Sequence, residues 1–146
     1  LGLVDQALKY WFRFNSSFNW HYDLALGVSF FLSLYQNAKA AFSLPVPARI
    51  VAIVTFIIVV LLVYKMIHSS SRERFYLLFL IVGALSNLYD RIYLGGVVDY
   101  FGVSLNGWRS SYFNLADVMI VIGLLGWCRA LTAQYELYER MRGNGI

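Results

Sequence analysis

Three long apolar stretches constrain the fold of this chain more than any other feature. They cover residues 48–64, 75–92 and 113–131, and their charged side chains lie at or near their ends. A helix of about 20 apolar residues is long enough to cross the hydrocarbon core of a bilayer. Hydrophobic residues make up 60% of the chain and charged residues 14%, against about 25% charged residues in an average soluble domain. We therefore expect a single integral membrane domain over residues 1–146, which excludes a soluble globular enzyme.

The basic residues predict how these spans are oriented. The connection 65–74 carries three Lys or Arg side chains and the tail 132–146 carries two, whereas residues 93–112 contain only Arg109. Cytoplasmic connections of membrane proteins are enriched in Lys and Arg. The 65–74 turn and the tail are thus predicted to be cytoplasmic, and residues 5–47 and 93–112 to face outward. The basic residues flank apolar stretches and form no continuous stripe, so we expect no nucleic-acid partner.

The N-terminal third of the chain is mixed. Six aromatic residues within 10–20 are typical of a membrane–water interface, with their rings in the headgroup layer. Residues 24–35 are apolar but too few to cross a bilayer as a helix, and their alternating and aromatic side chains predict a strand over 29–35. Residues 1–4 resemble the end of an apolar helix whose earlier part is absent, which would make the protein a four-span bundle.

A hairpin is predicted at Asn106-Gly107, because both residues tolerate the positive φ angles of a tight turn. Closing a two-residue turn there pairs Leu105 with Trp108, and the same register brings Asp99 near Asn114. A bulge in this hairpin would shift the register.

Asn114 is a natural N-cap for the third span, which makes Asp117 the third residue of that helix. Asp99 and Asp117 would then lie together at the outer membrane boundary. Two neighbouring carboxyl groups resist double ionisation, so one can act as a base toward water and the other as an acid toward a carbonyl. Taken singly, Asp117 is typical of a helix cap and Asp99 of an ordinary loop carboxylate. As a pair they are our candidate catalytic residues.

Other charged residues have simpler interpretations. Asp90 and Arg91, at a predicted helix end, indicate an interfacial ion pair. Asp5 and Lys9 are spaced as an ordinary helical i, i+4 pair. The two histidines lie on opposite predicted sides and the chain has one cysteine, so we expect no metal site.

Several sequence blocks together resemble the type II signal peptidases, the lipoprotein signal peptidases. No single block would carry the resemblance, but the last three are specific in combination. In order they are Asp5-Gln6 with Lys9, Asn37 with Ala40-Ala41-Phe42-Ser43, Gly83-Ala84-Leu85-Ser86-Asn87-Leu88-Tyr89-Asp90-Arg91, Gly96-Val97-Val98-Asp99-Tyr100 and Phe113-Asn114-Leu115-Ala116-Asp117.

The resemblance implies an all-α membrane protein, a four-helix bundle whose first helix is largely missing here, with a small outward-facing β element. It implies an aspartic endopeptidase of the bacterial plasma (inner) membrane, with the active site near the outer face and no metal or organic cofactor. The substrates would be prolipoproteins that carry a diacylglyceryl group, and we expect a monomer surrounded by membrane lipids.

The resemblance also assigns roles to individual residues. The catalytic dyad would be Asp99 and Asp117. Residues that match positions shaping the site or holding substrate are Asn37, Asn87, Arg91, Asn114 and Ala116, with Asp5, Lys9 and Asp90 in support.

This chain departs from the family pattern at two positions of these blocks. Lys39 stands where the family usually has Gly, and Ser86 replaces a usual Gly before Asn87. These departures and the missing first helix leave a catalytically inactive homologue acting as a membrane binding protein as one alternative. A small proton-coupled transporter is the other, although its carboxylates would usually lie near the bilayer midplane.

Overall fold

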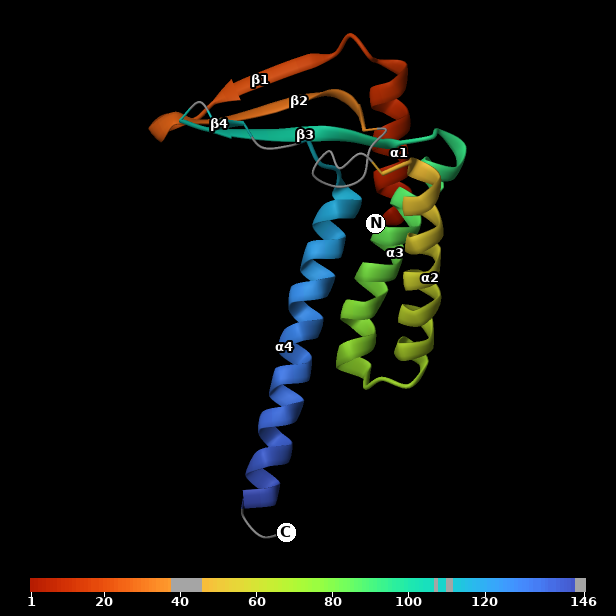
Figure 1. Cartoon of the computed structure of the whole chain (residues 1–146). Coiled ribbons are helices and arrows are strands. Elements are labelled where there is room, and N and C mark those ends of the chain that lie inside the picture. Colours follow the sequence, from red (N-terminus) through yellow and green to blue (C-terminus); the bar gives the residue numbers. More distant parts are fainter. Residues whose placement is uncertain (38–45, 107, 110–111, 144–146) are drawn as a thin grey trace.

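The computed structural model describes residues 1–37, 46–106, 108–109 and 112–143, which form a helical bundle with a β-sheet lying across one end (Figure 1). This arrangement confirms the predicted helical membrane bundle with a small β element. In chain order the elements are α1 (Gly2–Phe14), β1 (Asn19–Asp23), a short 3₁₀ turn (Ala25–Gly27), β2 (Val28–Asn37), α2 (Ala48–Ile67), α3 (Ser71–Tyr93), β3 (Val97–Leu105), β4 (Trp108–Arg109) and α4 (Leu115–Gly143).

The three predicted apolar stretches are α2, α3 and α4, and each is long and apolar enough to cross a membrane. In α2, 11% of the most apolar 18-residue stretch is buried inside the molecule. In α3 the corresponding share is 50%. A helix that is apolar all round and yet exposed is suited to face lipid. This fits α2, whereas α3 packs against both α2 and α4 and is the central helix. Helix α4 continues beyond residue 131 to Gly143 and projects past the α2–α3 turn (Figure 1).

Two glycines allow α3 and α4 to approach closely. A Cβ atom at Gly83 would lie 2.6 Å from the carbonyl oxygen of Ala116, and one at Gly123 would lie 2.8 Å from backbone atoms of Leu80 and Tyr76. Contacts this short are essentially never made by real Cβ atoms, so a side chain at either position would push the helices apart. The first turn of α4 is therefore held against the middle of α3.

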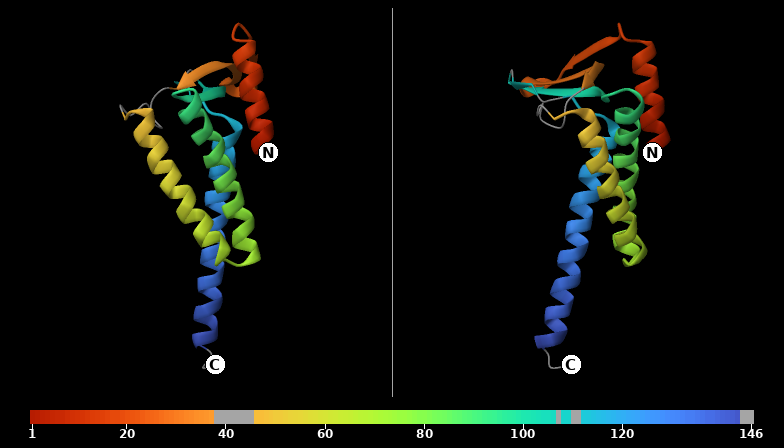
Figure 2. Two further views of the ribbon diagram at one scale, coloured as in Figure 1. Left: turned by 90° about the vertical axis from the view of Figure 1, so that its right-hand side faces the viewer. Right: turned by 45° about the vertical axis from the view of Figure 1, so that its right-hand side comes forward.

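Helix α1 lies beside the sheet end of α3 (Figure 2). The aromatic residues predicted to lie at the membrane interface divide into two groups. Tyr10, Trp11 and Phe14 are exposed, whereas Phe12 is buried and stacks on Tyr100 of β3 with ring centroids 4.9 Å apart. The buried face of α1 packs against the sheet. The prediction of aromatic residues at a membrane interface did not include this contact.

The sheet is antiparallel, in the order β1-β2-β3-β4, and the strand predicted over 29–35 lies within β2. The predicted pairing of Leu105 with Trp108 is confirmed. Further along, Phe101 pairs with Phe113, so the register shifts by one residue between the turn and this bridge. The shift leaves Asp99 beside Asn114, as the hairpin predicted.

Candidate active site

The start of α4 is fixed by a reciprocal pair of hydrogen bonds. The backbone N–H of Asp117 donates to Oδ1 of Asn114 at 2.9 Å, and the backbone N–H of Asn114 donates to Oδ2 of Asp117 at 3.1 Å. This is the capping-box arrangement, with Asn114 as N-cap and Asp117 three residues later. The predicted cap is confirmed, and it fixes the position of the Asp117 carboxyl group.

Asn114 also holds Asp99. Its Nδ2 donates to Oδ1 of Asp99 at 2.7 Å, and lies within 3.3 Å of the Val98 carbonyl oxygen. Asp99 is 3% exposed and Asn114 is fully buried. One side chain thus hydrogen-bonds to both elements that carry the carboxyl groups, β3 and α4, and brings Asp99 and Asp117 to the same place.

The environments of the two carboxyl groups differ. Burial and then the neighbouring Asp117 charge raise the pKa of Asp99 to about 7, against the opposing effects of Asn114, Lys9 and Arg91. Both oxygens of Asp117 accept N–H groups, Oδ1 from Nδ2 of Asn87 at 2.8 Å and Oδ2 from the backbone of Asn114. Such donors favour an ionised carboxylate, so a single proton shared by the pair is held preferentially by Asp99.

Behind this pair lies a buried charge cluster that we call the Lys9 cluster: Asp5, Lys9, Asn87 and Asp90. Nζ of Lys9 lies 2.8 Å from Oδ2 of Asp5, 2.9 Å from Oδ2 of Asp90 and 2.9 Å from Oδ1 of Asn87. The predicted i, i+4 pairing of Asp5 and Lys9 is confirmed, but the pair is not an ordinary surface pair, because Asp5 is fully buried and Lys9 is 2% exposed. Surface helical pairs of that spacing contribute little, whereas this pair joins α1 to α3.

Asp90 and Arg91 do not form the expected ion pair with each other. Asp90 binds Lys9 and accepts the backbone N–H of Val98 at 3.2 Å, while Nη1 of Arg91 donates to the carbonyl oxygen of Asn87 at 3.2 Å. Successive residues on a helix point in directions about 100° apart, so neighbours in sequence rarely pair. The Arg91 charge instead acts on Asp99.

The remaining predicted site residues lie at different distances from the carboxyl pair. The backbone N–H of Ala116 donates to Oδ1 of Asp5 at 3.2 Å, which links the first turn of α4 to the Lys9 cluster. Asn37 is the last residue of β2, opposite Val97 and two residues along the sheet from the partner of Asp99. Lys39 lies outside the described residues.

Tyr100 is a buried residue to which the sequence analysis gave no role. Its hydroxyl donates to Oδ1 of Asp5 at 3.0 Å and accepts the backbone N–H of Leu115 at 3.1 Å. The ring is fully buried, and burial raises the pKa of the hydroxyl. Its place directly after Asp99 on a strand puts it on the opposite face, which was the only available signal that it packs toward α1.

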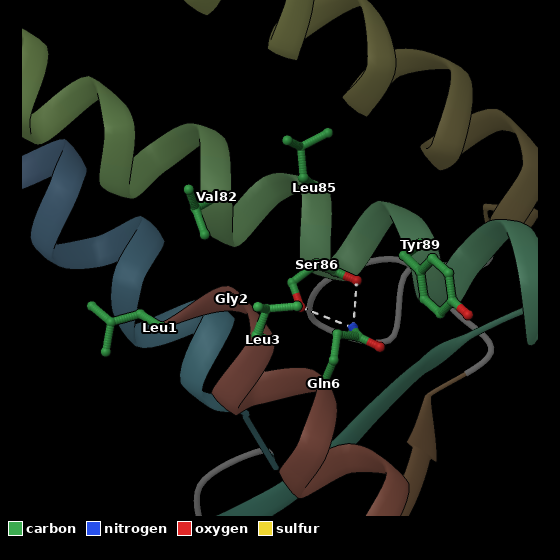
Figure 3. A pocket seen from close by; sticks show the side chains of 8 residues that line it. All are labelled: Leu1, Gly2, Leu3, Gln6, Val82, Leu85, Ser86 and Tyr89. Carbon is green, nitrogen blue, oxygen red and sulfur yellow. Dashed lines mark hydrogen bonds between the residues drawn. The ribbon is translucent and has the colours of Figure 1, made fainter.

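Ser86, the other departure from the family pattern, has partners on α1. Nε2 of Gln6 donates to the Ser86 hydroxyl at 2.9 Å and to its carbonyl oxygen at 3.1 Å (Figure 3), and the hydroxyl donates to Oδ2 of Asp5 at 2.7 Å. Ser86 therefore extends the Lys9 cluster rather than disturbing the helix contact.

One described cavity near this cluster does not contain the carboxyl pair. It lies between α1 and α3, has a volume of about 590 Å³, and its lining includes neither Asp99 nor Asp117. Its lining residues, drawn in Figure 3, are Leu1, Gly2, Leu3, Gln6, Val82, Leu85, Ser86 and Tyr89. The candidate active site is thus defined by the side-chain cluster, not by this cavity.

Comparisons with known proteins show which family this chain is similar to. The family model described as signal peptidase (SPase) II matches residues 1–132. The lipoprotein signal peptidase of Cellvibrio japonicus is 34% identical over 132 residues, which cover 84% of this chain and 76% of that protein. The corresponding protein of Blochmanniella pennsylvanica is 33% identical over 134 residues, covering 84% and 78%. A solved structure of a bacterial membrane enzyme aligns with a TM-score of 0.79 at 25% identity, covering 92% of this chain and 84% of that one.

Proposed function

Because the chain belongs to the signal peptidase II family, a family of multi-pass membrane proteases that process signal peptides, we propose that it cleaves prolipoproteins with an aspartate dyad. Asp99 and Asp117 are the two members, and the substrates are precursors with a diacylglyceryl-modified cysteine after the signal peptide. The observation that carries this proposal is the Asn114 side chain, which hydrogen-bonds to Asp99 and caps the helix at Asp117.

The environments of the two carboxyl groups support a division of roles. Asp117, whose two oxygens both accept N–H groups, is the base that removes a proton from water as the water oxygen bonds to the scissile carbonyl carbon. Asp99, with its raised pKa, is the acid that gives its proton to the carbonyl oxygen.

The second half of the reaction returns both groups to their starting state. The C–N bond breaks as the proton on Asp117 passes to the leaving nitrogen, and Asp99 regains its proton from the intermediate hydroxyl as the carbonyl re-forms. One water molecule is consumed, and the dyad ends with the single proton that it held at the start.

The position of the carboxyl pair supports this substrate class. The carboxyl pair is at the sheet end of the helices, close to the first turn of α4 and the last turns of α3 (Figure 1). A diacylglyceryl group keeps the modified cysteine in the bilayer, so the scissile bond lies near the headgroup plane. The basic residues of the opposite end support an orientation in which the sheet end faces outward from the bacterial plasma membrane. In this account Asn37 and Arg91 contact the substrate, and the protein acts as a monomer among membrane lipids.

The test is cleavage of a diacylglyceryl-modified prolipoprotein by the full chain in detergent, with the same precursor lacking the lipid as control. We expect cleavage of the lipidated precursor only, and a loss of at least about 10³-fold in Asp99→Asn and in Asp117→Asn. Thermal unfolding of each variant establishes that it is folded. Cleavage that persists in both folded variants contradicts the dyad, and a folded chain that never cleaves contradicts the proposed activity and favours the inactive homologue.

A further inference from the structure

Lys9 neutralises two carboxylates and makes a third contact, which charge neutralisation does not explain. An ammonium group has three hydrogens to donate and no lone pair to accept with. The Lys9 ammonium is 2% exposed and meets three acceptors, of which two are carboxylates and the third is the side-chain amide oxygen of Asn87 at 2.9 Å. The third contact points toward the carboxyl pair.

That contact determines which way the Asn87 amide faces. The atom facing Lys9 has to be the oxygen, because a donor cannot face a donor. Nδ2 of Asn114 donates to the same oxygen at 3.1 Å. The amide nitrogen of Asn87 is then left to face Oδ1 of Asp117, to which it donates at 2.8 Å. If the amide were turned over, its NH₂ group would face the donors of Lys9 and Asn114, and its oxygen would face the Asp117 carboxylate. None of these contacts would then be a hydrogen bond.

We propose that Lys9 is a positioning residue for the dyad, whose ammonium group fixes the Asn87 amide so that its N–H holds Asp117 in place as the base. The inference rests on the proposed function above. Lys9 does not touch the substrate in this account and acts only through Asn87 and through its charge.

The charged and titratable groups around the dyad come from five elements. They are Asp5 and Lys9 of α1, Tyr35 of β2 (opposite Asp99 in the sheet), Asp90 and Arg91 of α3, Asp99 and Tyr100 of β3, and Asp117 of α4. Of these, Lys9 and Arg91 are the cations that hold the pKa of Asp99 down. Removing the Lys9 charge therefore raises the pKa of Asp99 further, so the enzyme keeps its acid protonated to a higher pH. A purely structural Lys9 would not produce that shift.

The test compares three variants of the full chain in detergent. Lys9→Met removes the ammonium group but strands two buried carboxylates and is at risk of not folding. Lys9→Met with Asp5→Asn removes one charge of each sign and keeps the variant measurable. Lys65→Met is the matched control, because Lys65 also pairs with a buried acid, Glu73, at 3.6 Å but at the opposite end of α3.

We expect the double variant to lose about 10- to 100-fold in kcat with KM changed less than about threefold, and the alkaline limb of its pH–rate profile to move upward. Lys65→Met should keep the wild-type kcat and the wild-type limb. A folded double variant with wild-type kcat, or one with reduced kcat and an unmoved limb, overturns the role given to Lys9. Neither result affects the proposed function, which fails only if the wild type is inactive or the aspartate variants are active.

Discussion

The starts of α3 and α4 are built in the same way and differ in what faces the acid. Each has a polar cap residue followed three positions later by an acid: Ser70 with Glu73, and Asn114 with Asp117. Ser70 accepts the backbone N–H of Glu73 at 3.4 Å, and Asn114 accepts that of Asp117 at 2.9 Å. Both are sequence signatures of a helix start and neither by itself indicates catalysis.

The neighbours separate the two acids. Oε2 of Glu73 lies 3.6 Å from Nζ of Lys65 and accepts the indole N–H of Trp127 at 3.3 Å, so its charge is matched by a cation and a donor. Asp117 faces a second carboxyl group, Asp99, held by the same cap residue. A capping acid beside a cation joins helices, whereas a capping acid beside another acid forces the two to share a proton. The comparison therefore indicates where to expect chemistry.

The largest expected effect tests this difference directly. Asp117→Asn should lower the cleavage rate by about 10³-fold or more, because it removes the proposed base, whereas Glu73→Gln should stay within about threefold of wild type. Both changes replace a carboxylate by its amide at the third position of a helix. Initial rates on a lipidated precursor, with protein amounts corrected for the folded fraction, measure it. Equal losses in the two variants would remove the distinction between the two caps.

The next effect concerns stability. Tyr100→Phe removes a buried hydroxyl that bonds to Asp5 and to the N–H of Leu115, and should lower the free energy of unfolding by about 1–3 kcal/mol. Ser70→Ala removes an exposed hydroxyl from the other cap and should cost about 0.5–1 kcal/mol, because water can replace it. Thermal unfolding in one detergent compares them. A larger loss in Ser70→Ala would mean that the sheet-end cluster contributes less to folding than its burial indicates.

The smallest effect is a pH dependence of stability that comes from Asp99, at the sheet end of the helices. The folded-state pKa of Asp99, about 7, lies above the ordinary value of 3.8, so the folded protein binds that proton more tightly than the unfolded chain does. Stability is therefore lost as pH rises from about 4 through 7. Asp99→Asn has no titrating group at this position, so its stability relative to wild type should be higher by about 1 kcal/mol or more at pH 8.5 than at about pH 3.5, where Asp99 is mostly protonated in both the folded and the unfolded chain. A constant difference across this range would show that the charge of Asp99 is not the cause.

The local features of the chain were predictable from sequence. The apolar stretches predicted α2, α3 and α4, the Asn106-Gly107 turn predicted the pairing of Leu105 with Trp108, and the spacing of Asn114 and Asp117 predicted the cap. Each depends on residues close together in the chain, where spacing fixes geometry. Even the one-residue register shift left Asp99 near its predicted neighbour.

The contacts of α1 could not be predicted in the same way. One partner of Lys9, Asp90, lies 81 positions away in the sequence. In addition, the spacing of an i, i+4 pair is the same whether the pair is exposed or buried. The same holds for Tyr100 and its contact with Asp5. These contacts exist because α1 packs against α3 and the sheet, and the periodicity of a single helix does not show what covers it.

Asp99 and Asp117 are proposed to share one proton near neutral pH. The most direct measurement is an NMR titration of ¹³C-labelled aspartate carboxyl groups in detergent, with Asp99→Asn used to assign the Asp99 signal. We expect Asp99 to titrate with a pKa of about 7, and we expect Asp117→Asn to lower this pKa because the neighbouring charge is gone. An Asp99 signal that titrates near the ordinary value of 3.8 and does not respond to Asp117→Asn would contradict this proposal.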